Sequence, residues 1–211
     1  STIGRSILRL VPATSGQVTF DGTDLTALRG AELKAMRRRM QMIFQDPFAS
    51  LNPRMTVYDT LAEPLLLHGI ESRKTVAQGI LKLMDDVGLA RSFVRKYPHE
   101  FSGGQRQRIA IGRALATRPE FLVADEPVSA LDVTIQAQIL ELMQQLGREY
   151  NLTMLFVSHD LAVVRHLADR IMVLYKGKLI EHGTGDELFE RPQQEYTRQL
   201  LQSIPGRSRL T

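Results

Sequence analysis

The 211-residue sequence contains no cysteine and no tryptophan, and it has no long hydrophobic run. Without cysteine the chain can form no disulfide bond, so nothing in it indicates an oxidising compartment. The longest apolar runs, such as Met154–Val157, are far shorter than the roughly 20 residues that cross a bilayer. The first residues also lack the basic start and long apolar centre of a signal peptide. We therefore expect no transmembrane helix and a cytosolic location.

The composition is that of an ordinary globular protein, with 43% hydrophobic and 24% charged residues. A chain of this length can form one good core, or one core with a small additional subdomain. The net charge of +4 is a weak basic bias. The run Arg37–Arg39 could contact phosphates or lipid headgroups, but the favoured interpretation is the solvated face of a helix.

Strands and helices alternate along the chain, which predicts an α/β fold with a mainly parallel sheet. We expect strands at residues 17–20, 40–44, 121–124, 153–157, 171–175 and 178–181, the last two forming a hairpin. We expect helices at residues 1–10, 31–39, 57–67, 76–87, 106–117, 133–150, 186–190 and 195–203. Residues 48–53 are expected to be a loop, and the helices between 57 and 87 indicate an inserted helical subdomain.

The stretch Phe121–Ala124 is typical of a strand buried on both faces, and Asp125 and Glu126 follow it directly. Burying an unpaired carboxylate costs several kcal/mol, so acids at the tip of a core strand normally face a cation or a reacting group. Ligands of open α/β sheets bind at this end of the strands. Taken alone, the same string also fits a strand that runs into a polar turn.

Polar residues follow two further strands that are predicted to be buried. Gln45 comes after the strand at 40–44, and His159 comes after the strand at 153–157. Parallel strands bring their carboxyl ends to one edge, so Gln45, His159 and the two acids are expected to converge there. A lone histidine in this position would more often be structural. Because His159 is expected to converge with Gln45 and the two acids, it is predicted to contact phosphate or water.

The segment Ser102-Gly103-Gly104 opens a predicted helix. Free backbone N–H groups at the positive end of a helix dipole can bind an anion. Serine and glycine are also ordinary residues at helix starts, so this segment alone is weak evidence.

Together these motifs resemble those of the nucleotide-binding subunits of ABC transporters, in order and spacing across nearly the whole chain. The similar segments are the Q-loop at Gln45, the signature at Phe101–Gln105, the Walker B strand at Phe121–Glu126, the D-loop at Ser129–Asp132 and the switch histidine His159. The resemblance implies an ABC-type P-loop NTPase core with an inserted α-helical subdomain. Residues 1–46 and about 112–211 would form the core, and about 47–111 the helical subdomain that includes the signature.

Three segments resemble the oligopeptide, dipeptide and glutathione importer branch of the family: Gln45–Arg54, Tyr97–Phe101 and Tyr196–Leu201. One departure is Gln194-Glu195, where the branch usually has His-Pro. Some ATPase subunits of the branch carry a carboxy-terminal cysteine cluster for iron and sulfur, which this cysteine-free sequence cannot form.

Of the family's phosphate loop, G-x-x-x-x-G-K-[ST], the sequence contains only the end: Ser1 matches the hydroxyl residue and Thr2 the next one. The phosphate-cradling glycines, the lysine, the P-loop strand and the adenine-stacking aromatic residue further upstream are all lacking. We therefore interpret these residues as part of an ATPase, and we expect the 211-residue fragment itself to be inactive.

The resemblance implies ATP and Mg²⁺ as cofactors and assigns a role to each matching residue. The implied metal ligands are Ser1, Gln45 and Asp125, the last through water. The implied catalytic residues are Glu126 as general base, with His159 and Gln45. The implied nucleotide-binding residues are Ser1, Thr2, Gln45, Ser102, Gly103, Gly104, Gln105, Asp125, Asp132 and His159. Those of the signature would bind the γ phosphate of an opposite subunit's ATP, and Asp132 would lie at that dimer interface.

The implied function is to power a peptide-type importer from the cytoplasmic side of the cell membrane, as a peripheral subunit. Gln45–Arg54 and the helical subdomain would contact the transmembrane permease subunits, a second ABC ATPase domain would complete the dimer, and a solute-binding protein would take part indirectly. Nucleic acid is not expected as a partner. The transported solute cannot be identified, because the membrane subunits and the binding protein select it.

Two alternatives stay open. A soluble ABC ATPase acting on nucleic acid or ribosomes typically carries long inserted coiled coils or two linked cassettes, and the short helical block argues against the first kind. A non-catalytic ABC-like binding protein becomes relevant only if the phosphate loop is missing in nature.

Overall fold

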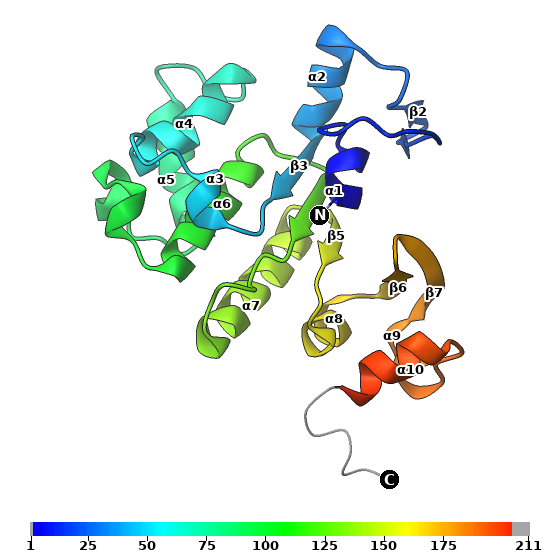
Figure 1. Ribbon diagram of the computed structural model, residues 1–211. Helices are drawn as coiled ribbons and strands as arrows, with labels where there is room; N and C mark the ends of the chain where they lie inside the picture. The colour runs from blue at the N-terminus through cyan, green and yellow to red at the C-terminus, as the bar shows by residue number, and fades with distance from the viewer. Residues whose placement is uncertain (1, 204–211) are drawn as a thin grey trace. The chain divides into compact units, whose positions relative to one another are not determined.

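The structure is a computed structural model that describes residues 2–203. The chain folds into two compact units, the first ending at Val157 and the second beginning at Ser158. The first unit contains a small hairpin, a parallel sheet and a group of helices (Figure 1). These helices lie between strands β3 and β4 in the sequence. Its elements are α1 (Thr2–Ile7), β1 (Thr19–Phe20), β2 (Thr23–Asp24), α2 (Gly30–Arg39), β3 (Met40–Ile43), α3 (Pro47–Ser50), α4 (Val57–Leu67), α5 (Val76–Asp86), η1 (Arg91–Arg95), η2 (Pro98–Glu100), α6 (Gly103–Leu115), β4 (Phe121–Asp125), α7 (Val133–Glu149) and β5 (Thr153–Val157).

The parallel sheet of the first unit has the strand order β3-β4-β5, which confirms the predicted parallel α/β fold. Strand β4 lies in the centre, and its residues Leu122, Val123 and Ala124 are at most 2% exposed, as predicted for a strand buried on both faces. Strand β5 has the predicted bounds, but its residues are exposed or half-buried. The prediction of a buried third strand is wrong in that respect, because only β4 pairs with β5 among the described residues.

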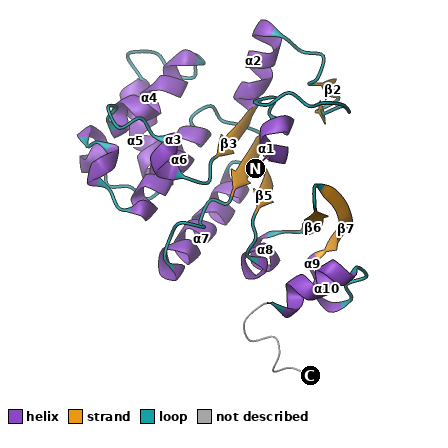
Figure 2. Ribbon diagram, in the orientation of Figure 1, coloured by secondary structure: helices purple, strands orange, loops and turns teal. Residues whose placement is uncertain are grey.

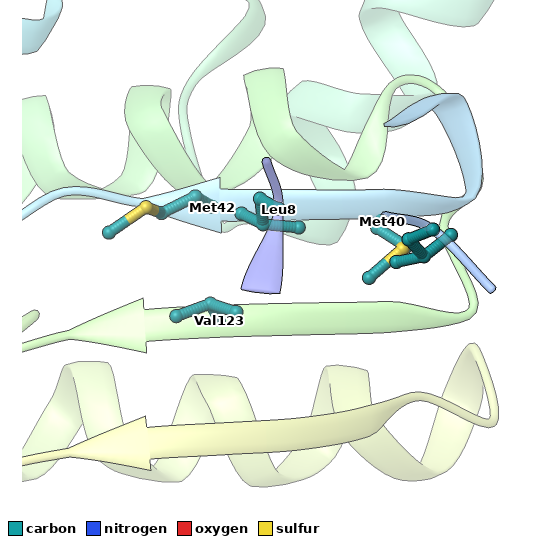
Figure 3. Close-up of a cluster of buried hydrophobic side chains, with 5 residues drawn as sticks. Leu8, Met40, Met42 and Val123 are labelled. Atoms are coloured by element: carbon teal, nitrogen blue, oxygen red, sulfur yellow. The ribbon is translucent and has the colours of Figure 1, made fainter. Parts of the chain in front are cut away.

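Helix α1 packs against one face of this sheet. A Cβ atom on Gly4 would lie 2.7 Å from Val123 Cγ1, so the close approach of helix and strand depends on glycine. Leu8 joins Met40, Met42 and Val123 in one buried cluster, and Figure 3 shows Leu8 beside β3 with Val123 on the neighbouring strand. Met40 and Met42 share a face because side chains alternate along a strand.

The predicted helix at residues 1–10 is shorter in the structure, since α1 ends at Ile7. Arg9 adopts a left-handed backbone conformation (φ 55°) that ends the helix. The carbonyl oxygens that follow α1 accept hydrogen bonds from Arg37, one of them from Arg37 Nε to Leu8 O at 3.1 Å. Arg39 pairs with Glu120 at 2.6 Å. Arg37 and Arg39 therefore make contacts between separate segments of the chain. The prediction that the basic run is only the solvated face of a helix is wrong for these two residues.

The segment between β3 and β4 consists of helices and loops, as the predicted helical insertion requires (Figure 2). Helix α4 has the predicted bounds, and Thr56 Oγ1 accepts a hydrogen bond from Asp59 N at its start. Helix α6 begins at Gly103 rather than at the predicted residue 106. Residues 47–50 form the short helix α3 where a loop was expected, because the Asp46 carboxylate accepts hydrogen bonds from two N–H groups of that turn.

The second unit contains helices around an antiparallel hairpin. Its elements are α8 (Leu161–Leu167), β6 (Arg170–Tyr175), β7 (Lys178–Thr184), α9 (Gly185–Glu190) and α10 (Glu195–Gln202). Strands β6 and β7 form the predicted hairpin, and helix α8 was not expected from the sequence. The core of the second unit consists of the buried residues Ile171, Val173, Leu188, Phe189 and Leu201. None of the helices among residues 2–203 is both long and apolar enough to cross a membrane.

Candidate functional site

The candidate site lies at the carboxyl end of β4, at Asp125 and the following residue, Glu126. Asp125 is the last residue of the strand and is 2% exposed. Glu126 has a left-handed backbone conformation (φ 46°), and its N–H donates to Val157 O at 2.8 Å. Such a conformation is uncommon outside glycine and costs on the order of 1 kcal/mol, so the surrounding structure must hold it in place. The chain thus turns sharply at the residue with the candidate catalytic carboxylate.

Gln45 contacts the carboxylate of Glu126 directly. Gln45 Nε2 donates a hydrogen bond to Glu126 Oε2 at 2.9 Å, although the two residues are 81 positions apart. The contact forms because β3 and β4 are parallel neighbours, so the residues after each strand emerge at the same edge. The structure therefore brings together two of the residues that the sequence had placed at this edge.

The signature segment caps helix α6. Ser102 N–H donates to Gln105 Oε1 at 3.1 Å, and Gln105 N–H donates to Ser102 Oγ at 3.4 Å. This reciprocal capping box stabilises the helix start. The two glycines allow close packing: a Cβ on Gly103 would lie 3.1 Å from Leu131 Cδ2, and one on Gly104 would lie 2.5 Å from Ile135 Cγ2. The start of α6 is thereby pressed against the segment that carries the D-loop.

The loop from Glu126 to Asp132 is fixed at both ends. Ser129 Oγ donates to Glu126 O at 3.1 Å, and Ile135 N–H donates to Asp132 Oδ1 at 3.0 Å at the start of α7. The amide of Gln136 donates to the carbonyl oxygens of Val128 and Leu131. This loop links the Glu126 carboxylate to the glycines of the signature. Gln136 was not singled out from the sequence, because a glutamine on a helix carries no motif.

The segment after Gln45 is attached to helix α6 by two arginines. The guanidinium of Arg106 lies 5.0 Å from the centre of the Phe48 ring, in a cation–π contact. Arg113 donates a hydrogen bond to Ser50 O. Burial lowers the pKa of Arg113 below its usual range, which marks this contact as partly shielded from water. The segment after Gln45 is thus in direct contact with the signature helix.

Three further predicted site residues are not placed at this edge by the described contacts. Ser1 falls outside the described residues, and Thr2 is the first residue of α1. His159 belongs to the second unit, just before Asp160, whose carboxylate accepts a hydrogen bond from Ala162 N at 2.9 Å and caps α8. The expected meeting of His159 with the edge of the sheet stays a prediction.

The side chains at the edge of the sheet fit a magnesium nucleotide. Mg²⁺ usually takes one or two carboxylates from the protein and completes its shell with phosphate oxygens and water. Buried Asp125 and the Gln45 amide supply that kind of sparse oxygen set. Within residues 2–203 no group of three or more His, Asp or Glu side chains is placed to hold a metal ion.

Comparison with known proteins identifies one family. The family model described as ABC transporter matches residues 1–129. The oligopeptide transport ATP-binding protein OppF of Bacillus subtilis is 53% identical over 207 residues, which cover 97% of this chain and 68% of that protein. A Brucella ovis protein named for peptide import and ATP binding is 53% identical over 206 residues, covering 98% of this chain. The present chain spans 65% of the length of the Brucella relative.

Solved structures match the fold. A dimeric ATP-binding cassette in a post-hydrolysis state with ADP and Pi superposes with a TM-score of 0.77 at 31% identity, over 87% of this chain and 79% of that one. The cbiO1 protein of Clostridium perfringens, part of an ABC transporter complex, has a TM-score of 0.79 at 24% identity, over 97% and 79% of the two chains. The second match concerns the fold alone.

Proposed function

Because this chain belongs to the ABC transporter family, we propose that it is the ATP-binding and ATP-hydrolysing part of a subunit that powers a peptide-type importer. The observation that carries the proposal is the hydrogen bond from Gln45 to Glu126 at the carboxyl edge of the parallel sheet. This hydrogen bond joins the end of β4, where the candidate base Glu126 lies, to the segment after β3 that leads into the helices. The peptide specificity rests on the names of relatives at about half identity.

The chemistry at this edge would be the attack of water on the γ phosphate of ATP. Phosphoryl transfer depends mostly on positioning and electrostatic stabilisation, and bound Mg²⁺ neutralises charge that develops on the phosphates. Asp125, through water, and Gln45 would hold the metal together with Ser1. Glu126 would orient the attacking water and accept its proton. His159 would contact the γ phosphate.

A second ATPase domain would complete each nucleotide site. Helix α6 spans 13 residues, and Ser102 at its start is exposed, so its first N–H groups can face an anion from outside the chain. We infer that Ser102, Gly103, Gly104 and Gln105 bind the γ phosphate of ATP held by the opposite subunit. Asp132 would lie at the same interface. The dimeric state of a structural neighbour supports this arrangement.

We also propose the division of the chain that the motifs imply. Residues 1–46 and about 112–211 would form the RecA-like core, and about 47–111 the helical subdomain with the signature. The segment Gln45–Arg54 and this subdomain would contact the permease subunits. The partly exposed ring of Phe48, held by Arg106, supports a contact there. The subunit would then be peripheral on the cytoplasmic side of the cell membrane.

The proposed function is tested by removing the gene and measuring uptake of labelled di- and oligopeptides. We expect uptake of at least one peptide class to be lost and then restored by the wild-type gene. A gene with Glu126→Gln should fail to restore it. Unchanged peptide uptake, together with a defect in translation or DNA repair, would instead favour the soluble ABC ATPase alternative.

A polypeptide limited to these 211 residues should neither bind MgATP tightly nor hydrolyse it. The glycine-rich loop provides most of the backbone donors to the phosphates, and its lysine provides the main positive charge. Without them, Asp125 and Glu126 present negative charge to an anionic ligand. Calorimetric titration of MgATP into this polypeptide and into one extended through the phosphate loop measures the difference. Micromolar binding by the shorter polypeptide would contradict the expectation.

A further inference from the structure

The first unit contains a groove of about 590 Å³ that is lined by none of the residues assigned to the nucleotide site. Three separate stretches form its walls: helix α2, the end of helix α4, and the turn between α6 and β4. The polar lining includes Lys34, Arg38, His68, Thr117 and Arg118. Its volume lies within the range of small-molecule sites, which is roughly 300–1,000 Å³.

Two of the lining cations have no acidic partner in the described part of the chain. Lys34 and Arg38 are four positions apart on α2, and like charges at this spacing destabilise a helix. Within residues 2–203, neither has an acidic side chain within ion-pair distance. By contrast, Arg39 pairs with Glu120 at 2.6 Å, and Arg118 lies 3.8 Å from Glu71. The groove therefore presents two uncompensated positive charges in addition to its paired ones.

Two other side chains mark the wall of the groove as polar and electropositive. The pKa of His68 is lowered, mainly by burial and further by the charges of Lys34 and Arg38, so both charges act on this wall. Thr117 is 2% exposed, and its hydroxyl has no hydrogen-bond partner in the described part of the chain.

We infer that this groove binds a phosphate-bearing dianion, held by Lys34 and Arg38 with Arg118 at its side. A dianion would neutralise both free charges, and a guanidinium matches the geometry of phosphate oxygens. A free phosphorylated metabolite and the headgroup of an anionic phospholipid share this chemistry. Because the groove joins α2 to the end of α4, the bound anion would also hold the helical block against the sheet. Such a ligand would act on the proposed ATPase from outside the nucleotide site.

The binding test uses inorganic pyrophosphate as the probe. The full-length protein, with its nucleotide site saturated by MgADP, is titrated by calorimetry at low salt. We expect saturable binding that the double variant Lys34→Gln/Arg38→Gln weakens at least tenfold. The matched control is Arg73→Gln/Lys74→Gln, which removes two exposed cations outside the groove and should change the affinity less than twofold.

The charge state of His68 provides a readout that a merely structural role of Lys34 and Arg38 would not change. Lys34, Arg38 and Arg39 from α2, with Arg118 and Glu120 from the turn before β4, are the charged groups that share the groove with it. A bound dianion favours the imidazolium form, so pyrophosphate should raise the pKa of His68 by about half a unit or more in an NMR titration. In the Lys34→Gln/Arg38→Gln variant the pKa should start higher and no longer respond.

Vesicle flotation distinguishes the two sources of the phosphate. Binding to phosphatidylglycerol vesicles but not to phosphatidylcholine vesicles, lost in the Lys34→Gln/Arg38→Gln variant, would support the site with a lipid as its ligand. Saturable pyrophosphate binding without vesicle binding would support it with a soluble ligand. The inference is overturned if neither probe binds, or if both bind the double variant and the wild type equally.

Discussion

Glu126→Gln, made in a chain that contains the phosphate loop, should leave ATP binding intact and lower the rate of hydrolysis at least ~10²-fold, as for loss of a general base. The substitution keeps the size of the side chain, and the new amide oxygen can still accept the hydrogen bond from Gln45 Nε2. What it removes is the ability to take a proton from water. Steady-state phosphate release measures turnover, and calorimetry with MgATP measures binding.

The matched control is Glu141→Gln, which neutralises an exposed carboxylate on α7 that belongs to none of the motifs. Its rate of hydrolysis should stay within twofold of the wild-type rate. If Glu126→Gln weakens binding but preserves turnover, Glu126 is a structural or binding residue and the assignment of the base is wrong.

The elements that the sequence predicted well are those with a long apolar pattern and local end signals. Helix α4 has five buried residues and is preceded by a capping box, and its predicted bounds match the structure. Helix α8 has a single buried residue, so its apolar pattern was too weak to be recognised. The strand expected at residues 17–20 is only the two-residue β1 (Thr19–Phe20) in the structure, and its partner β2 was not expected, because two residues are too short for any alternation to be read.

The site was predictable as a set of residue positions but not as a set of contacts. The parallel order of β3 and β4 follows from the alternation of strands and helices, and it places Gln45 and Glu126 at one edge. Their hydrogen bond, like the pairing of Arg39 with Glu120, joins residues 81 positions apart. No local pattern encodes such a distance. The same holds for the reciprocal capping by Ser102 and Gln105, because a capping role and an anion-binding role use the same residue types at a helix start.

The second large effect is predicted for Ser102→Arg, which should prevent dimerisation. Ser102 also caps helix α6, so this substitution removes a helix cap as well. We expect this variant to bind ATP as a monomer. Its ATP-dependent dimerisation should be weakened more than about a hundredfold and thereby lost. The arginine would project from the start of α6 into the space proposed for the partner's γ phosphate. It would also add a large side chain next to Gly103 and Gly104, which already pack closely against Leu131 and Ile135 of the same chain, so the start of α6 has little room to adjust.

Loss of the helix cap alone must be separated from loss of the interface, because removing an N-cap costs roughly 0.5–2 kcal/mol of stability. Thr184→Arg provides the match: Thr184 also caps a helix through a capping box, with Glu187 as its partner, in α9. Both arginine variants are made in the Glu126→Gln background, where slow hydrolysis keeps ATP bound, and are compared by gel filtration with and without ATP. Thr184→Arg should still dimerise, whereas Ser102→Arg should elute as a monomer under both conditions. An ATP-dependent dimer of Ser102→Arg would place the signature outside the interface, since its exposed helix start would then have no contact with the partner's nucleotide.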